Sequence, residues 1–152
     1  MAVGICIITV LGIFFGDLWI KNRIERTGGE KFPAYLAGKK LIIKKYHNTG
    51  AMLNFGASRR AVVTGVSVLL TVLISIAFIL SLGHRGNHTL RAGLALLLGG
   101  SFSNTYDRLK RRYVVDYLSF HVKWPWLRRI VFNLSDFCII IGSFLTVAAL
   151  PD

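Results

Sequence analysis

Two aspartates in apolar surroundings are the residues of this chain best suited to chemistry. Asp116 follows Tyr-Val-Val, and Asp136 precedes a hydrophobic run that reaches Leu150. A carboxylate inside an apolar segment of membrane length is costly, so such a residue indicates a functional site. If the fold brings the two carboxyl groups together, they can share one proton, which is the working state of the pair in an aspartic protease.

The elements that must position these carboxylates are predicted to be membrane helices. Of the 152 residues, 53% are hydrophobic, and an apolar run of about 20 residues is long enough to cross a bilayer. We predict an all-α membrane protein, a single integral membrane domain over 1–152, with four transmembrane helices at about 2–20, 61–82, 89–107 and 130–150. The first run lacks a basic start and a cleavage site, so we interpret it as a retained anchor.

Two polar segments connect these helices. In 21–60, Gly28-Gly29 and Pro33 interrupt any helix, and the strand-like Leu41-Ile42-Ile43 is followed by a turn signal at Asn48-Thr49-Gly50. We therefore expect a small extramembrane β/loop element between helices one and two, lying on the membrane surface. The segment 108–129 contains Trp124-Pro125-Trp126, and tryptophans near basic residues indicate the membrane interface.

The net charge of +12 is concentrated in these two segments, which hold 17 of the 19 Lys and Arg. Because they border the membrane runs, we expect contact with anionic lipid rather than with nucleic acid. The excess of basic residues would place both segments in the cytoplasm.

Four of the seven acidic residues are expected at or near the ends of apolar helices on one side of the membrane: Asp17, Asp107, Asp116 and Asp136. Asp17 and Lys21 are four residues apart and can pair on one helical face. Asn104, Asp107 and Arg108 also share a face, so Arg108 is expected to pair with Asp107. Ordinary helix-end ion pairs are the alternative interpretation.

Asp136 is predicted about six residues into the last helix, or ~9 Å from its start. Asn133 would lie one turn earlier on the same face and hydrogen-bond to it. A purely structural Asp capped by Asn stays open for this pair.

Other kinds of site have less support. The histidines lack a ligand spacing typical of a metal site, and Cys6 and Cys138 are expected to be buried apolar side chains. Ser101, Ser103 and Ser135 have no nearby His for a triad, although a Ser-Lys arrangement stays open.

Five sequence blocks occur in an order and spacing typical of one family. They are Asp17-Leu-Trp-Ile-Lys21, Asn48-Thr-Gly50-Ala51, Gly99-Gly-Ser-Phe-Ser-Asn104 with Tyr-Asp107-Arg108, Val114-Val-Asp116-Tyr, and Phe132-Asn133-Leu-Ser-Asp136. On these blocks the chain resembles lipoprotein signal peptidase (signal peptidase II), the intramembrane aspartyl protease family of bacteria. One short block is a weak match, but five in order are strong support.

The resemblance implies that Asp116 and Asp136 form a catalytic dyad, one carboxylate activating water and the other polarising the scissile carbonyl. The implied substrate is a diacylglyceryl-modified prolipoprotein, cleaved just before its lipidated cysteine. The resemblance also implies a multi-pass monomer of the bacterial cytoplasmic membrane that needs no metal or organic cofactor. The residues implied to position the dyad and substrate are Asp17, Lys21, Asn48, Gly50, Asn104, Asp107, Arg108 and Asn133.

The family places its dyad at the extracytoplasmic face, which is the reverse of what the basic residues indicate; we follow the family. The chain also departs from the family pattern, because Ser103 and Arg112 stand where the family usually has Gly and Phe55 is displaced within its block. Arg112 lies four residues before Asp116, so we expect its charge to lower the pKa of Asp116 and to disfavour a shared proton.

Two other functions are kept open. The first is a catalytically impaired relative that binds lipidated peptide or anionic lipid. The second is a small transporter or channel that uses the intramembrane carboxylates as a proton relay.

Overall fold

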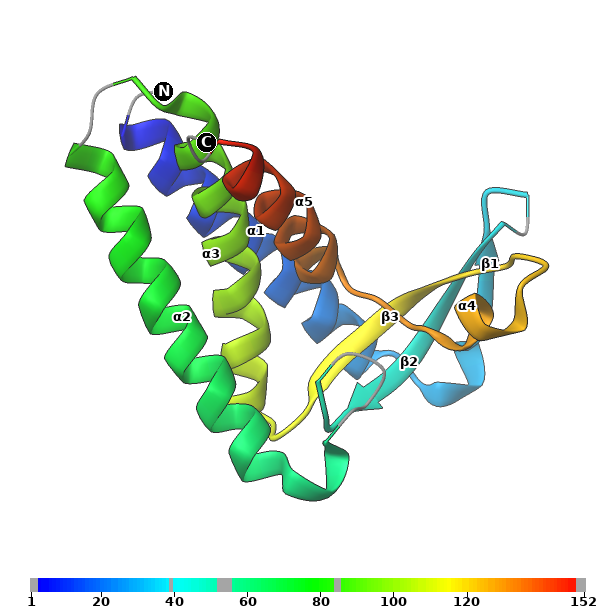
Figure 1. Ribbon diagram of the computed structural model, residues 1–152. Coiled ribbons are helices and arrows are strands. Elements are labelled where there is room, and N and C mark those ends of the chain that lie inside the picture. Colours follow the sequence, from blue (N-terminus) through cyan, green and yellow to red (C-terminus); the bar gives the residue numbers. More distant parts are fainter. Residues whose placement is uncertain (1–2, 39, 52–55, 84–85, 150–152) are drawn as a thin grey trace.

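The structure, a computed structural model, describes residues 3–38, 40–51, 56–83 and 86–149. Four long helices lie side by side, and a three-stranded sheet projects from one end of the bundle (Figure 1). The helices are α1 (Val3–Arg26), α2 (Arg60–Gly83), α3 (His88–Lys110) and α5 (Leu134–Ala148). The strands are β1 (Ala34–Leu36), β2 (Leu41–Asn48) and β3 (Val114–Phe120), and the short elements are η1 (Gly29–Lys31), η3 (Ala57–Arg59) and α4 (Pro125–Arg129).

A helix occupies each of the four predicted apolar segments. Among the described residues, two helical stretches are long and apolar enough to cross a membrane: Val3–Arg26 and Ala57–Gly83. Helix α5 is apolar but has only 15 residues. The fold is therefore helical with two clear membrane-length helices, and a crossing by α3 and α5 stays a prediction.

The last helix starts later than predicted. The chain before it is extended, because Phe132 forms a bridge with Leu118 of β3. Helix α5 begins after Asn133, whose side chain accepts a hydrogen bond from the backbone N–H of Asp136 while the Asp136 carboxylate accepts from the Asn133 N–H. This reciprocal capping box fixes a helix start. Asp136 therefore lies in the first turn of α5, and the predicted depth of six residues was wrong.

Asp116 was also placed wrongly, because it lies on a strand and not at a helix end. The sheet has the order β1-β2-β3 with antiparallel neighbours, and β2 is the strand predicted around Leu41-Ile42-Ile43. Asp116 pairs with Tyr46 and Val114 pairs with Asn48. Residues two apart on a strand share a face, so Asn48 lies diagonally across from Asp116 on the same side of the sheet.

Helix α3 is the centre of the bundle and packs against α1, α2 and α5. Its contact with α5 is close because glycine leaves no side chain between the backbones. A Cβ atom on Gly100 would lie 2.6 Å from the carbonyl oxygen of Ser135. This contact brings Asn104, one turn after Gly100, next to Asp136, which follows Ser135.

Candidate active site

Asn133 connects the two predicted catalytic aspartates. Its side-chain Nδ2 donates to Oδ1 of Asp116 at 2.7 Å, and its backbone N–H donates to Oδ2 of Asp136 at 2.9 Å. Asn133 itself is fully buried. One asparagine at the junction of the extended segment and α5 therefore holds a carboxylate from the sheet and a carboxylate from the bundle.

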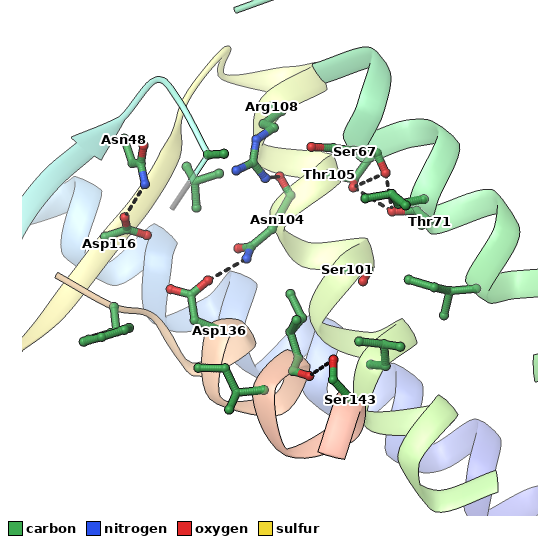
Figure 2. A pocket seen from close by; sticks show the side chains of 18 of the residues that line it. Asn48, Ser67, Thr71, Ser101, Asn104, Thr105, Arg108, Asp116, Asp136 and Ser143 are labelled. Atoms are coloured by element: carbon green, nitrogen blue, oxygen red, sulfur yellow. Dashed lines mark hydrogen bonds between the residues drawn. The ribbon is translucent and has the colours of Figure 1, made fainter. Parts of the chain in front are cut away.

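The other oxygen of each carboxylate accepts from a second asparagine. Nδ2 of Asn48 donates to Oδ2 of Asp116 at 3.0 Å, and Nδ2 of Asn104 donates to Oδ1 of Asp136 at 2.9 Å (Figure 2). Asn48 is oriented in turn by Gly50, whose backbone N–H donates to its Oδ1 at 3.1 Å. All four carboxylate oxygens thus accept a hydrogen bond from an uncharged N–H group.

The two aspartates line a cavity of about 480 Å³ between α2, α3, α5 and β3 (Figure 2). Apolar side chains such as Leu70, Ile74 and Ile140 form much of its wall. Arg108 also lines the cavity and donates to the carbonyl oxygens of Asn104 at 3.2 Å and Gly50 at 3.1 Å. Arg108 therefore ties α3 to the turn after β2 beside the dyad.

The Asp116 carboxyl holds its proton unusually well. Burial, and secondly the charge of Asp136, raise its pKa from 3.8 to about 7. Arg112 was expected to lower this pKa, and that prediction was wrong. Arg112 lies in the turn after α3 with a φ of 69° and an exposed side chain, so its charge is largely screened by water.

A second cluster lies behind the dyad, around a buried ion pair. Lys21 Nζ is 2.7 Å from Oδ2 of Asp17, as the spacing predicted, and 3.3 Å from Oδ2 of Asp107. Asp107 pairs through its Oδ1 with Nε of Arg111 at 3.0 Å and not with Arg108. The predicted Asp107–Arg108 pair was therefore wrong, because Arg108 turns toward Gly50 on the cavity side.

Three residues of this cluster were not among the predicted site residues. Ser103 and Ser135 each donate to Oδ2 of Asp17 at 2.6 Å, and the Tyr117 hydroxyl donates to Oδ1 at 2.9 Å. Burial raises the pKa of Tyr117 well above its ordinary value, so the hydroxyl keeps its proton. The position of Tyr117 in the sequence could have indicated this role. Tyr117 follows Asp116 directly, and neighbouring residues of a strand face opposite sides, so Tyr117 must face away from the dyad.

The structure therefore brings the ten predicted site residues together at one end of the bundle, in two clusters that Asn104 connects. The first, the dyad cluster, contains Asp116, Asp136, Asn48, Asn104 and Asn133, with Gly50 and Arg108 at its edge. The second, the ion-pair cluster, contains Asp17, Lys21 and Asp107, together with Ser103, Ser135 and Tyr117. The displaced Phe55 lies outside the described residues.

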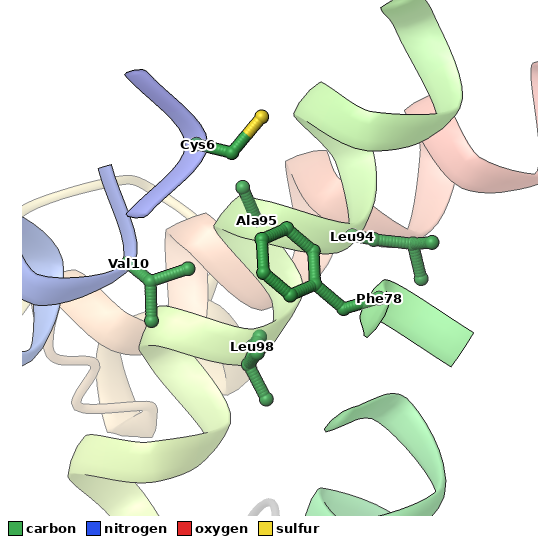
Figure 3. Close-up of a cluster of buried hydrophobic side chains, with 6 residues drawn as sticks. All are labelled: Cys6, Val10, Phe78, Leu94, Ala95 and Leu98. Atoms are coloured by element: carbon green, nitrogen blue, oxygen red, sulfur yellow. The ribbon is translucent and has the colours of Figure 1, made fainter. Parts of the chain in front are cut away.

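Cys6 lies away from both clusters, in the role that its sequence context predicted. Cys6 is fully buried in an apolar cluster of α1, α2 and α3 with Val10, Phe78 and Leu94 (Figure 3). Cys138 is half-buried in α5. Within the described ranges, no group of three or more His, Cys, Asp or Glu could hold a metal ion, and His84 lies outside them.

Comparison with known sequences gives one family. The sequence model of the family Signal peptidase (SPase) II matches residues 8–150. The lipoprotein signal peptidase of Moorella thermoacetica is 41% identical over 99 residues, which cover 65% of this chain and 61% of that protein. The lipoprotein signal peptidase of Mesorhizobium japonicum is 35% identical over 136 residues, covering 86% of this chain and 76% of that protein.

The match spans about three fifths of the Moorella relative and 56% of a third relative, the lipoprotein signal peptidase of Alteromonas mediterranea. Two solved structures described as bacterial membrane enzymes share the fold. They have TM-scores of 0.80 and 0.76 at 21% and 22% identity, and the alignments cover 97% of this chain and 87% and 92% of theirs. Because the family match extends over nearly the whole chain, this protein belongs to the signal peptidase II family.

Proposed function

We propose that this chain is an intramembrane aspartyl endopeptidase that removes signal peptides from diacylglyceryl-modified prolipoproteins. Family membership supports the class of reaction. The observation that carries the aspartyl mechanism is the bridging of both carboxylates by Asn133, with amide donors on all four oxygens. Neutral donors hold the carboxyl groups in place without fixing both of them in the charged form.

In the proposed reaction, the dyad starts with one shared proton. The ionised carboxylate removes a proton from a water molecule, whose oxygen bonds to the scissile carbonyl carbon. The protonated carboxyl donates its proton to the carbonyl oxygen, which gives a tetrahedral diol. As the C–N bond breaks, the proton taken from water passes to the amine, and the diol returns a proton to the other carboxylate, so the dyad again holds one shared proton. Because the pKa of Asp116 is about 7, this residue is well suited to hold the proton before the substrate binds.

The cavity would receive the hydrophobic signal peptide. Its apolar wall between α2 and α5 suits such a segment, and Asn104 and Arg108 at the dyad end supply polar groups for its backbone. We assign Asn48, Gly50 and Asn133 to positioning the dyad. Asp17, Lys21 and Asp107 would fix the elements that carry it.

The proposed setting is the bacterial cytoplasmic membrane, crossed four times by a monomer with the dyad at the extracytoplasmic face. The basic segments 21–60 and 108–129 would then contact anionic lipid headgroups. Labelling of single cysteines introduced into these segments, from either side of a sealed membrane, tests this orientation.

The decisive experiment is cleavage of a diacylglyceryl-modified prolipoprotein in detergent by wild type, Asp116→Asn and Asp136→Asn. We expect each substitution to lower kcat on the order of 10⁴-fold, as loss of a residue that acts in proton transfer does. Glu25→Gln is the matched control, because Glu25 forms a partly exposed pair with Lys45 outside the dyad cluster. Retained cleavage by both dyad variants would contradict the mechanism.

The same assay separates the alternatives. A catalytically impaired relative would bind the lipidated peptide without cleaving it, in wild type as in both variants. A proton-relay transporter would instead show a dyad-dependent flux in proteoliposomes and no cleavage.

A further inference from the structure

Lys21 is a lysine with no exposed surface whose donors are all used. Its Nζ lies 2.7 Å from Oδ2 of Asp17, 2.8 Å from Oδ1 of Asn104 and 3.0 Å from Oγ of Ser103. An ammonium group has three N–H donors, so these three acceptors saturate it. Asp107, at 3.3 Å, is the more distant partner.

The bond to Asn104 determines which way its side-chain amide points. Because Oδ1 faces Lys21, Nδ2 faces the other way and donates to Oδ1 of Asp136 at 2.9 Å (Figure 2). A flipped amide would set its NH₂ against the ammonium and its oxygen against the carboxylate, two repulsive contacts. Arg108 donates to the backbone oxygen of Asn104, so this bond does not orient the side-chain amide.

We propose that Lys21 is a positioning residue for Asp136 that acts through Asn104. By holding Oδ1 of Asn104, it keeps a donor directed at one of the two carboxylates. A lysine that only neutralised buried acids would need no contact with Asn104. This inference rests on the proposed function, because it concerns the reactivity of the same dyad.

Ser103 also helps to hold Lys21 in place. Its hydroxyl accepts from Lys21 and donates to Oδ2 of Asp17, so it bridges the two members of the ion pair. The hydroxyl that departs from the usual family pattern therefore contributes to holding the ammonium in place.

A substitution of Lys21 alone would leave Asp17 buried without its cation, which is strongly destabilising. The test therefore uses the charge-neutral pair variant Asp17→Asn/Lys21→Met. Four proteins are compared: wild type, the pair variant, Asn104→Ala, and the combination of all three substitutions. A cycle of this kind measures whether two residues act through one another.

We expect the pair variant to lower kcat about 10- to 100-fold, because small misplacement of a reacting group has effects of this size. Added to Asn104→Ala, it should lower kcat less than about twofold. Glu25→Gln/Lys45→Met, which removes a partly exposed ion pair, is the matched control and should leave kcat unchanged. An equal loss in the presence and absence of Asn104 would overturn the proposal, and so would a pair variant with wild-type kcat.

A second readout does not depend on cleavage. Infrared titration of ¹³C-labelled aspartate, with Asp136→Asn as the reference that identifies its band, follows the protonation of the dyad. Besides Lys21, the charged or titratable groups that interact with Asp136 are Asp17, Asp116, Arg108 and Tyr117. Removing Asp17 and Lys21 together leaves their summed charge unchanged. Any difference between their direct effects on Asp136 persists in Asn104→Ala, so the part of the shift that is lost in that background reports the orientation of Asn104.

We expect the pair variant to shift the titration midpoint by about one pH unit when Asn104 is present, and by much less with Asn104→Ala. If this coupling is observed but the wild type cleaves nothing, the proposed function is contradicted, whereas the positioning role of Lys21 is supported. A wild type that cleaves but shows the same shift in both backgrounds would contradict the role of Lys21 alone.

Discussion

The dyad cluster and the ion-pair cluster contain the same chemical group in two different surroundings. Asp17 and Asp107 lie against cations, at 2.7 Å from Lys21 and 3.0 Å from Arg111. Asp116 and Asp136 accept hydrogen bonds from the amides of Asn48, Asn104 and Asn133. A cation beside a buried carboxylate favours the ionised form. The amides also favour it, but at Asp116 burial outweighs them and the pKa is raised to about 7, so this carboxyl can still exchange a proton.

The chain builds both surroundings from adjacent residues. Tyr117 serves the ion-pair cluster while Asp116 serves the dyad cluster, and Ser135 and Asp136 divide in the same way. Asp116 and Tyr117 face opposite sides because neighbours alternate along a strand. Ser135 and Asp136 point in different directions because they are successive residues in the first turn of α5. Adjacent residues therefore belong to different clusters, and the bond between Lys21 and Asn104 connects the two.

Among substitutions of the groups that hold the carboxylates, the largest expected effect comes from Asn133→Ala, which removes the side chain that holds Asp116 and caps α5. We expect kcat to fall on the order of 100-fold, because one directed donor to a reacting group is worth about this much. The lost cap should also destabilise the protein by about 1 kcal/mol. Cleavage rates and the thermal unfolding midpoint in detergent measure the two effects.

The matched control is Asn87→Ala. Asn87 caps α3 in the same way, accepting from the Leu90 N–H at 2.9 Å. It should lose a similar amount of stability and keep its cleavage rate. If both variants lose the same amount of activity, the loss of activity results from the loss of stability. The proposed role of the amide donors at the dyad would then be contradicted.

The next largest effect is expected in the pH dependence of stability and cleavage, which tests the protonation of Asp116. Asp116 has an ordinary pKa of 3.8 and a folded-state pKa of about 7. Between these values the folded protein binds more protons than the unfolded chain, so stability falls as the pH rises through this range. Above about pH 7 the dyad also loses its shared proton, and kcat/KM should fall about tenfold per pH unit.

Cleavage rates and unfolding midpoints measured from about pH 4 to about pH 9 test both parts. In Asp116→Asn the loss of stability between about pH 4 and about pH 7 should be much smaller, because the titrating group is gone. An unchanged pH dependence in that variant would assign the titration to another group.

The sequence predicted contacts within one helix better than contacts made by irregular segments. Asp17 and Lys21 form the expected pair because four-residue spacing on a helix is sufficient to bring them together. The environment of Asp116 was not predictable in this way. Its strand is buried along most of its length, so it shows no alternation, and an apolar run next to a helix is easily assigned to the helix.

The partner of Asp107 was predicted wrongly, although the helical spacing favoured the observed one. Arg111 follows Asp107 by four residues, a spacing that brings side chains together, whereas Arg108 is the next residue and faces another way. What the sequence does not give is the group toward which Arg108 turns. That choice depends on Gly50, which reaches Arg108 from a segment 58 residues away. The convergence of the carboxylates and the pairing of Asp17 with Lys21 could be predicted from the sequence, but the partners of Asp116 required the fold.

The smallest expected effect concerns Arg112, a cation outside both clusters. Its φ of 69° is unfavourable for a residue with a Cβ atom, and glycine adopts this conformation without steric cost. Arg112→Gly should therefore raise stability by about 0.5 kcal/mol, after the greater chain entropy of glycine is subtracted. The unfolding midpoint measures this gain.

Arg112→Ala separates charge from backbone conformation, because it removes the guanidinium and keeps the Cβ atom. We expect it to leave both the unfolding midpoint and the pH dependence of cleavage unchanged, since the side chain is exposed and distant charges are screened. A shift of the alkaline limb in both Arg112 variants would mean that this cation reaches the dyad through the protein. The contrast between amide-held and cation-held carboxylates would then be weaker, because a cation outside both clusters would also act on the dyad.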